Sequence, residues 1–359
     1  MKQKTSKKTR LLANDNGYAD HKLAWLADDG AIMTLKVPTL IQVGSSGLAT
    51  TAGQRKGAYC VDNVEYSCNA SISEPMKVRN SDYPTSIANR VLFTHAMVRA
   101  GLLGMPVKAS VTLPFRDYYS HDGSMNEELK AACKANFMQN NVEIVGITSK
   151  PEIVDVEVRA EALSAFMDWA MTDKFQWSDK YNELEDMLGE VLVVDIGGST
   201  TDLVTLQIVE DEDGPEMAIN HNKSGTEKVG VLDAKARLSE LAMHKMQMAG
   251  VSGLSGHGAG LTAMWLEQAM QRKQVMYAGK KWDVSEEIEL SCRGVAERIS
   301  NYIKTTVGSP ESYYAILVVG GGAIVFRKWL EQMLPNAVFT DEFANARGLL
   351  KFMIYKESE

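Results

Sequence analysis

Two short stretches of this sequence place an aspartate and a glycine directly after an apolar segment. Val191–Leu203 reads Val-Leu-Val-Val-Asp-Ile-Gly-Gly-Ser-Thr-Thr-Asp-Leu, and Leu11–Asp20 reads Leu-Leu-Ala-Asn-Asp-Asn-Gly-Tyr-Ala-Asp. A glycine lets the backbone reverse tightly, so that its N–H groups can point at an anion. The aspartate beside the turn can hold a hydrated Mg²⁺. Because the two stretches lie far apart in the chain, the sequence predicts a phosphate clamped between two similar domains.

The segments around these stretches have the patterns of alternating strands and helices. Residues 42–60 are rich in Gly, Ser and Thr, and we expect loops there. Strand hairpins followed by helices occur twice, which predicts a duplicated α/β fold with a ligand-binding cleft between the halves. The expected strands are 11–13, 21–26, 32–37, 107–113, 143–147, 153–158, 191–195, 203–208 and 315–319, and the expected helices are 85–103, 126–140, 160–170, 233–248, 261–272, 285–305 and 345–352.

A third glycine turn, Gly320–Gly322, follows the apolar segment Ala315–Val319 and has no acidic residue. A triple glycine between a strand and a helix beginning near Ile324 allows a flat ligand to press against the backbone, and it opens a helix N-terminus toward a polar group. This suits an adenosine moiety better than a phosphate. A tight strand-to-helix turn with no ligand is the equally good alternative.

The composition limits the class of protein. A length of 359 residues suggests two or three domains, and a net charge of −8 argues against a broadly basic surface for nucleic acid. The four cysteines are scattered without a Cys-x-x-Cys pair, which favours reduced thiols in the cytoplasm and argues against structural zinc. No apolar run is long enough to predict a membrane-spanning helix. The basic segment Met1–Arg10 is expected to be a solvated leader, and an electrostatic tail is the alternative.

The order of the three glycine turns resembles the actin, hexokinase and heat-shock ATPase superfamily, and within it the plasmid-segregating bacterial actins of the ParM (StbA) family. Asn14–Lys22 is similar to the first phosphate loop, Asp195–Asp202 to the second, and Val318–Ala323 to the adenosine motif. Ala109–Pro114 and the Asn-Ala-Arg-Gly stretch at Asn345–Gly348 also fit the family.

The resemblance implies a duplicated actin-like (ribonuclease H-like) two-domain fold with a nucleotide cleft between the domains. Domain I would comprise residues 1–188, with the C-terminal segment 334–359 returning to it. Domain II would comprise residues 189–333.

The resemblance also implies roles for individual residues. Asp15 and Asp195 would lie on opposite walls of the cleft and hold Mg²⁺ through its waters. Lys22 would direct its ammonium at the phosphates, although a solvated strand lysine is the alternative. Backbone N–H groups and hydroxyls of the two loops would contact the phosphates, and these residues are Asn16, Gly17, Tyr18, Gly197, Gly198, Ser199, Thr200 and Thr201.

Glu161, at the expected start of the helix after strand 153–158, is the candidate for orienting and deprotonating the attacking water. Glu152 and Glu157 are the alternatives, and a glutamate in a first helical turn can also simply complement the helix dipole. Asp202 would assist the metal site or cap its turn. The resemblance further implies nucleoside contacts, with ribose or base at Thr226, Glu227 and Gly230 and adenosine at Gly320, Gly321, Gly322 and Ala323.

The function implied is an ATPase that polymerises with Mg-ATP into dynamic head-to-tail filaments and segregates plasmid DNA through a DNA-binding adaptor. The acidic net charge fits an adaptor rather than direct nucleic-acid binding, no membrane contact is expected, and GTP stays open as the nucleotide. The alternatives are a non-polymerising ATP-dependent assembly or chaperone-like factor, and a small-molecule kinase with Asp117 or Asp155 as its catalytic acid. The glycine-rich stretch Gly250–Gly260, with His257, is expected to be a surface loop, because it lacks the lysine of a P-loop.

Overall fold

The computed structural model describes residues 8–51, 53–69, 72, 74–120, 122–212, 214–251, 261–334 and 336–358. Most of the Gly250–Gly260 stretch, including His257, and the first seven residues of the basic segment lie outside the described residues.

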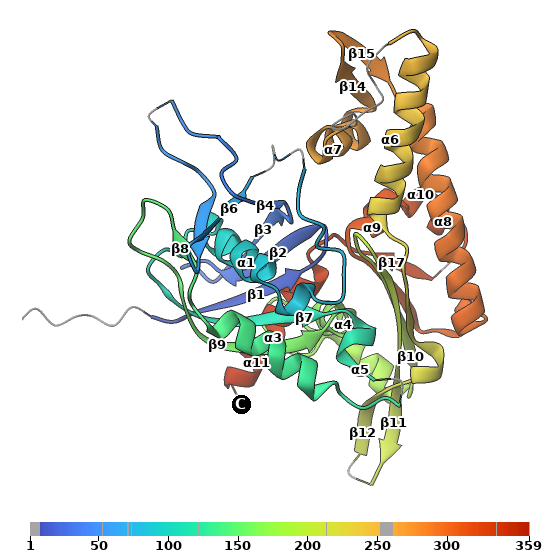
Figure 1. The fold of residues 1–359 in the computed structure, drawn as a ribbon. Coiled ribbons are helices and arrows are strands. Elements are labelled where there is room, and N and C mark those ends of the chain that lie inside the picture. The colour runs from blue at the N-terminus through green and yellow to red at the C-terminus, as the bar shows by residue number, and fades with distance from the viewer. Residues whose placement is uncertain are drawn as a thin grey trace, which may run out of the picture.

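Two five-stranded paths with the same plan form the framework (Figure 1). In the first sheet β1 (Arg10–Asn16) pairs antiparallel with β2 and parallel with β7, and in the second β10 (Glu190–Ile196) pairs antiparallel with β11 and parallel with β16. The strand orders are β3-β2-β1-β7-β9 and β12-β11-β10-β16-β17. The duplication expected from the two Asp-x-Gly stretches is therefore confirmed in the strand order. The remaining strands of these paths are β2 (Asp20–Leu26), β3 (Ile32–Pro38), β7 (Pro106–Leu113), β9 (Glu152–Ala160), β11 (Thr201–Asp211), β12 (Gly214–Ile219), β16 (Ala315–Val319) and β17 (Ala337–Phe339).

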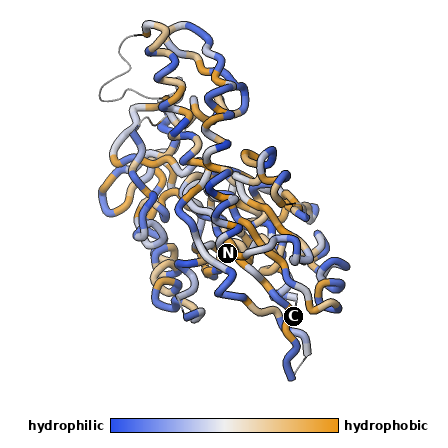
Figure 2. Tube along the Cα trace, turned by 90° about the vertical axis from the view of Figure 1, so that its right-hand side faces the viewer, coloured by the Kyte–Doolittle hydropathy of each residue, from blue (hydrophilic) through white to orange (hydrophobic). Residues whose placement is uncertain are grey.

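Helices cover both faces of each sheet, which explains why β10 and β16 are nearly continuous apolar runs rather than alternating ones. In β10, Leu192 and Val194 belong to one core cluster while Val191 and Val193 belong to another. Figure 2 shows the apolar strands in the interior of the trace, with more hydrophilic segments toward the outside. The first sheet is covered by α1 (Ile87–Arg99), α3 (Glu127–Met138) and α11 (Ala344–Ser358), and the second by α4 (Leu163–Ala170), α5 (Asp179–Asp186), α6 (Val231–Met248) and α8 (Ser285–Val307).

A small sheet was missed by the sequence analysis. Loops were expected over 42–60, and of this sheet only the strand at 143–147 was expected, but β4, β6, β5 and β8 form a four-stranded sheet that packs against α1. These strands are short and interrupted by polar residues, so their pairing depends on the apolar cover that α1 provides. Their bounds are β4 (Ile41–Val43), β5 (Ala58–Val61), β6 (Val64–Cys68) and β8 (Glu143–Ile144).

The remaining elements extend the second half. The hairpin of β14 (Gln274–Tyr277) and β15 (Lys280–Asp283) turns through Ala278 and Gly279, both with positive φ. Among the described residues, no helix is long and apolar enough to cross a membrane. The other short elements are α2 (Phe115–Tyr118), α7 (Ala263–Arg272), α9 (Gly321–Val325), α10 (Arg327–Leu330) and β13 (Gly225–Glu227).

The C-terminal segment is shared between the two sheets. β17 pairs with β16 in the second sheet, although the sequence analysis assigned all of 334–359 to the first domain. The following helix α11 packs on β1 and crosses α4. At the crossing, a Cβ added to Gly348 would lie 1.7 Å from the Ser164 carbonyl oxygen, so only glycine fits.

Candidate functional site

Two equivalent hairpin turns meet between the halves. Asp15 pairs in register with Lys22 across the first hairpin, and Asp195 pairs with Asp202 across the second. The second turn is closed by a hydrogen bond of 2.9 Å from the Gly197 N–H to the Thr200 carbonyl. A Cβ added to Gly198 would lie 2.5 Å from the Cβ of Ala19, so the two turns are in direct contact. The tertiary structure thus brings together two stretches that lie far apart in the chain.

The first hairpin holds a buried ion pair. The Lys22 Nζ lies 3.0 Å from Asp15 Oδ2, and both side chains are almost fully buried. The Thr112 hydroxyl, at the end of β7, lies 3.3 Å from both Asp15 Oδ1 and Glu161 Oε1. The Asn16 side chain accepts from the Thr112 N–H at 2.9 Å. β7 therefore connects Asp15 with the candidate catalytic Glu161.

The second hairpin carries two buried carboxylates. Asp195 Oδ2 accepts a hydrogen bond of 2.5 Å from the Asn345 amide. Asp202 accepts from the hydroxyls of Thr200 and Thr226. The Thr201 hydroxyl donates to the Val229 carbonyl at 2.9 Å. Three of the hydroxyls expected near the ligand are thus engaged within the protein.

These carboxyl groups are crowded. Burial raises the pKa of Glu161 well above its usual range, and the Asp15 carboxylate raises it further. Burial and Asp15 raise the pKa of Asp195 to about 6. Burial, opposed by the hydrogen bond from Thr226, raises the pKa of Asp202 to about 7. Burial alone would lower the pKa of Lys22, but Asp15 and its neighbours raise it, so Lys22 stays charged.

The sequence analysis expected Glu161 at the start of a helix, but Glu161 lies outside α4. β9 extends to Ala160, and α4 begins only at Leu163. Between them the Leu163 N–H donates to the Glu161 carbonyl at 2.7 Å, and Ala162 has φ of 65° and ψ of −51°. This is a γ-turn with positive φ, which is rare and strained for a residue with a Cβ. The alternatives Glu152 and Glu157 lie along β9, and Glu157 is paired with Arg159.

The glycines at the edge of the second sheet are required by close packing. A Cβ on Gly230 would lie 2.5 Å from the Gly198 carbonyl, and α6 begins here because its first N–H groups donate to the carbonyls of Gly197 and Gly198. Gly320 has φ of 82°, and a Cβ there would lie 2.6 Å from Asp195 Oδ1. α9 begins at Gly321, earlier than expected, with Gly321, Gly322 and the buried Ala323 in its first turn.

The first-loop backbone is held from the side. The Gly17 carbonyl accepts from the Thr39 hydroxyl at 2.8 Å. The Tyr18 ring lies 5.4 Å from the Tyr83 ring, and its hydroxyl donates to the Asn80 carbonyl at 3.3 Å. In the second half, β13 brings Glu227 opposite Thr201 and Thr226 opposite Asp202.

The site fits a phosphate with a hydrated divalent cation. The Ser199 hydroxyl lies in the second turn beside Gly198, where it is buried and has no hydrogen-bond partner among the described residues. A nearby cation would favour the ionised forms of Asp195 and Asp202, whose pKa values are raised here. Within the described ranges, no group of three or more His, Cys, Asp or Glu is arranged to hold a metal directly. Mg²⁺ retains several waters and needs few protein ligands, so the residues present suit it.

Three residues of the site were not assigned by the sequence analysis. Thr112 and Asn345 stand in the stretches noted for the family resemblance, but no spacing rule indicates their contacts. Arg79 Nη2 donates to the Ser199 carbonyl at 2.7 Å and lies 3.4 Å from Asp233. Arg79 comes from the first half and reaches the second turn, a contact that only the folded chain creates.

Comparisons with known proteins identify the fold family. Residues 11–171 match the family described as the N-terminal domain of the plasmid segregation protein ParM. Residues 193–332 match the C-terminal domain of the archaeal actin homologue MreB-like family. The chain is thus similar to ParM in its first half and to an archaeal actin homologue in its second half. No curated protein sequence matches this actin-like chain.

Solved structures agree with this assignment along the whole chain. A non-polymerisable mutant of pCBH ParM is 17% identical, with a TM-score of 0.71 over 97% of this chain and 99% of that one. ParM in a 15-stranded filament from Clostridium botulinum is 18% identical, with a TM-score of 0.69 over 96% and 99%. The archaeal actin homologue Ta0583 in complex with ADP is 18% identical, with a TM-score of 0.70 over 97% and 99%. At these identities the likeness establishes the fold, which is the duplicated two-domain actin-like fold expected from the sequence.

Proposed function

We propose that this chain is a nucleotide hydrolase that binds Mg-ATP between its two hairpin turns and assembles into head-to-tail filaments. The observation that carries the proposal is the direct contact of the two turns, each with a buried aspartate at the end of its central strand. The ADP complex of an archaeal actin homologue supports nucleotide binding. The filament of a ParM supports self-assembly. GTP remains the alternative nucleotide.

Each residue of the site has a defined task in this proposal. Asp15 and Asp195 hold the hydrated cation from the two halves, and Lys22 faces the phosphates beside Asp15. When bound, Mg²⁺ would offset the charge of the phosphate oxygens. The N–H groups of the two turns bind the phosphates, joined by the Ser199 hydroxyl. Glu161 accepts the proton of the attacking water, for which its raised pKa is suited. The nucleoside would be bound by Thr226, Glu227, Gly230 and Gly320–Ala323.

Nucleotide hydrolysis is tested with purified protein, Mg²⁺ and ATP or GTP. We expect phosphate release that requires Mg²⁺, and Glu161→Gln should lower kcat by about 100-fold or more while nucleotide affinity stays within about threefold. Lys108→Gln is a matched surface control, because Lys108 pairs with Glu357 away from the site. Equal turnover by wild type and Glu161→Gln would remove Glu161 from the mechanism.

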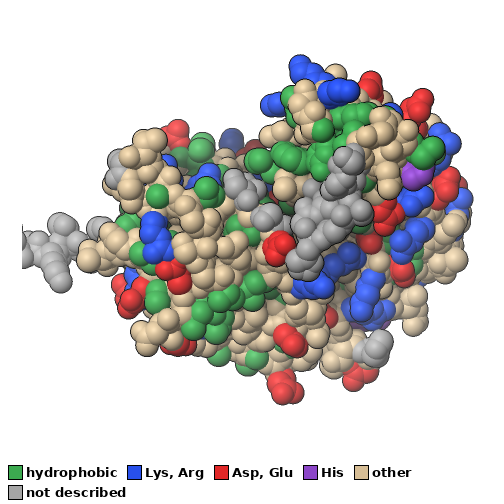
Figure 3. All heavy atoms as spheres, turned by 45° about the horizontal axis from the view of Figure 1, so that its top comes forward, with side chains coloured by type: hydrophobic (Ala, Val, Ile, Leu, Met, Phe, Trp, Pro, Cys, Tyr) green, Lys and Arg blue, Asp and Glu red, His purple; other side chains and the backbone are tan. Residues whose placement is uncertain are grey.

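The β14–β15 hairpin and the β11–β12 hairpin lie at opposite ends of the second half (Figure 1), and their exposed charges differ in sign. At one end, the β14–β15 region exposes four basic residues beside one exposed acid, Asp283, and Figure 3 shows basic and apolar side chains on this part of the surface. At the other end, the β11–β12 hairpin exposes acidic residues that form no ion pair among the described residues. The basic set is Arg272, Lys273, Lys280 and Lys281, and the acidic set is Glu210, Asp211, Glu212 and Glu216. Complementary ends favour head-to-tail contacts, which generate filaments rather than closed rings.

Charge reversal tests this arrangement. We expect Lys280→Glu with Lys281→Glu, and separately Glu210→Lys with Glu212→Lys, to raise the critical concentration for nucleotide-dependent light scattering by about tenfold or more. A mixture of the two double variants should assemble again, because the β14–β15 region of each variant then meets a β11–β12 hairpin of opposite charge on the other variant. Assembly of either variant alone at the wild-type concentration would contradict this arrangement. If electron microscopy of the wild-type protein showed no filaments at any concentration, the proposal that the protein forms filaments would be wrong.

We further propose that the filament moves plasmid DNA through a DNA-binding adaptor in the cytoplasm, without direct contact to nucleic acid or membrane. The match to the ParM N-terminal family supports this cargo, and the net charge of −8 favours an adaptor. Sedimentation of filaments with and without plasmid DNA tests it, since DNA should not co-sediment until the adaptor is added. A non-polymerising assembly factor would instead hydrolyse ATP with no rise in light scattering, and a small-molecule kinase would transfer the γ-phosphoryl group to an acceptor with no rise in light scattering.

A further inference from the structure

Helix α11 begins where the two sheets meet, and Asn345 lies in its first turn. The Asn345 side chain is only 4% exposed. Its Nδ2 donates to Asp195 Oδ2 at 2.5 Å, and its Oδ1 accepts from the Ala162 N–H at 3.1 Å. An asparagine amide carries a donor and an acceptor at fixed separation. One side chain therefore joins the end of β10 in the second sheet to the turn that follows β9 in the first.

The turn that Asn345 holds is the strained one next to Glu161. The backbone of Ala162, a non-glycine residue with φ of 65°, is strained, and this conformation persists only where the surroundings enforce it. The hydrogen bond from Ala162 to Asn345 is one such constraint. Because Glu161 directly precedes Ala162, the conformation of the turn determines where the Glu161 carboxylate lies relative to Thr112 and Asp15.

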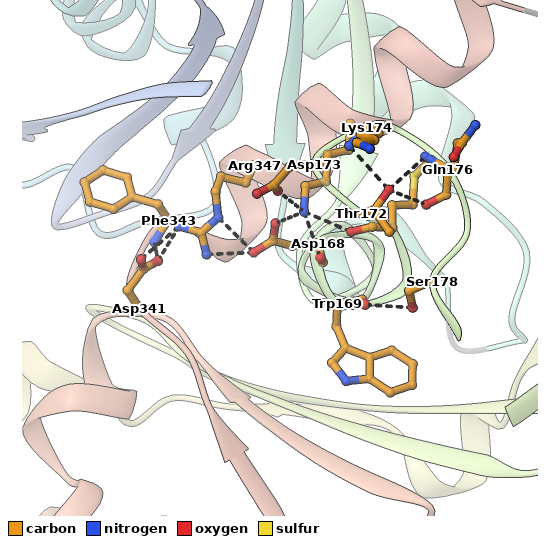
Figure 4. A network of polar contacts seen from close by, with 12 residues as sticks. Asp168, Trp169, Thr172, Asp173, Lys174, Gln176, Ser178, Asp341, Phe343 and Arg347 are labelled. Atoms are coloured by element: carbon orange, nitrogen blue, oxygen red, sulfur yellow. Dashed lines mark hydrogen bonds and ion pairs between the residues drawn. The ribbon is translucent and has the colours of Figure 1, made fainter. Parts of the chain in front are cut away.

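The first turns of α11 are themselves fixed in place, as Figure 4 shows for Arg347. Arg347 donates twice to Asp168 of α4, at 2.9 and 2.7 Å, and twice to Asp341 before α11, at 2.7 and 2.9 Å. Lys351 lies 2.9 Å from Asp168 Oδ1. At Gly348 the backbones of α11 and α4 touch. The helix turn that carries Asn345 is therefore anchored to α4 and to Asp341 by several contacts.

We infer that Asn345 is a positioning residue, whose amide sets the Asp195 carboxylate and the Glu161 turn in one mutual arrangement. The inference rests on the proposed nucleotide hydrolysis, because it assigns a role to the geometry between the cation side of the site and its general base. Asn345 itself does not need to touch the nucleotide. Its loss should affect turnover far more than nucleotide affinity, since displacing a reacting group by about 1 Å can cost on the order of 100-fold in rate.

Two variants separate the two hydrogen bonds. Asn345→Ala removes both, whereas Asn345→Asp keeps an acceptor for the Ala162 N–H and loses the donor to Asp195. Amide hydrogen exchange in nucleotide-free protein should become faster at Ala162 in Asn345→Ala and remain slow in Asn345→Asp. Unchanged exchange at Ala162 in Asn345→Ala would overturn the role of Asn345 in holding the turn. Hydrogen exchange does not depend on hydrolysis, so it tests whether Asn345 holds the turn even if the proposed function is wrong.

The kinetic test uses a double-mutant cycle with Glu161→Gln. We expect Asn345→Ala and Asn345→Asp to lower kcat by about tenfold or more, with KM within about threefold. In the Glu161→Gln background, Asn345→Ala should lower kcat by less than about twofold, because the group it positions is already lost. Losses that multiply in the double variant would overturn the inference, as would an unchanged kcat in Asn345→Ala.

Asn136 provides the matched control for a merely structural effect. It is also a buried asparagine that bridges two elements, since it accepts from Arg90 and donates to the Ser86 carbonyl at 3.0 Å. Asn136→Ala should lower the melting temperature with kcat unchanged. If Asn136→Ala and Asn345→Ala lowered kcat equally, Asn345 would be an ordinary structural residue. A wild type that fails to hydrolyse nucleotide would instead count against the proposed function.

Discussion

The two halves of the molecule contain the same hairpin, but the buried charges at its turn differ between them. Asp15 and Asp195 occupy equivalent ends of β1 and β10, and each faces one residue of the next strand. In the first hairpin that residue is Lys22, which pairs with Asp15 at 3.0 Å. In the second it is Asp202, so two carboxyls share one buried turn. The position opposite the buried aspartate thus occurs once in each half. Lys22 at this position makes the first hairpin neutral, and Asp202 makes the second acidic.

This difference suggests a division of labour. A buried ion pair is internally compensated, so the first hairpin is complete without a ligand. The second hairpin carries carboxyls whose pKa values are raised to about 6 and about 7. Carboxyls in such a state become ionised more readily when a cation is bound. We therefore expect the second hairpin to be the side of the site that responds to Mg²⁺.

The largest expected effect is common to both halves. Asp15→Asn and Asp195→Asn should each lower Mg²⁺-dependent turnover by about 100-fold or more, since each removes one of the two charges proposed to face the cation. Phosphate release at saturating Mg-ATP measures this. If only one variant lost activity, the equivalence of the two aspartates would be wrong.

The same two variants should differ in stability. Asp15→Asn leaves Lys22 buried without its charged partner, and breaking such a pair costs about 3 kcal/mol or more. Asp195→Asn relieves crowding among carboxyls and should leave the unfolding free energy unchanged or higher. Urea denaturation of nucleotide-free protein, monitored by circular dichroism, compares them. Equal destabilisation would show that the two hairpins do not differ as described.

The pH dependence of stability should distinguish the second hairpin. The pKa of Asp202 is raised to about 7, so the folded protein binds this proton more tightly than the unfolded chain, and the resulting stability is lost as the pH rises through about 7. The pKa values of His21 and His95 are lowered to about 3 and about 4, so these histidines have the opposite effect. Their contribution makes the folded protein more stable as the pH rises toward about 6.5. We therefore compare wild type with Asp202→Asn, which removes the contribution of Asp202, lowers the pKa of Glu161 by removing a neighbouring charge, and leaves both histidines in place.

Between pH 6 and pH 8.5, wild type should lose stability relative to Asp202→Asn by about 1 kcal/mol or more, and saturating Mg²⁺ with nucleotide should reduce the difference. Thermal melting across this pH range measures it. Parallel curves for the two proteins would contradict the raised pKa.

The smallest expected effect concerns the Ser199 hydroxyl, which is buried without a partner. Ser199→Ala should be neutral or slightly stabilising in nucleotide-free protein, because it removes an unsatisfied polar group. It should weaken nucleotide binding by about threefold to tenfold, the loss of one hydrogen bond. Thr201→Ala is the matched control, since the Thr201 hydroxyl already bonds the Val229 carbonyl and its loss should lower stability instead.

Much of the framework followed from local sequence patterns. The strands β1, β10 and β16 are buried on both faces, so their apolar runs were visible without knowledge of their neighbours. The repeated Asp-x-Gly stretch predicted the duplication that the strand order confirms. The small sheet of β4, β6, β5 and β8 was missed, because its strands depend on α1 rather than on their own pattern.

The sequence by itself determined the residue types of the site and the two turns that carry them, since glycine and aspartate at these positions are local requirements of a tight turn. Tertiary structure alone decided that Thr112 lies between Asp15 and Glu161, and that Asn345 connects the γ-turn before α4 to Asp195. These contacts join segments separated by up to half the chain. Their geometry depends on how the two sheets, α4 and α11 pack together, and no local spacing encodes that packing.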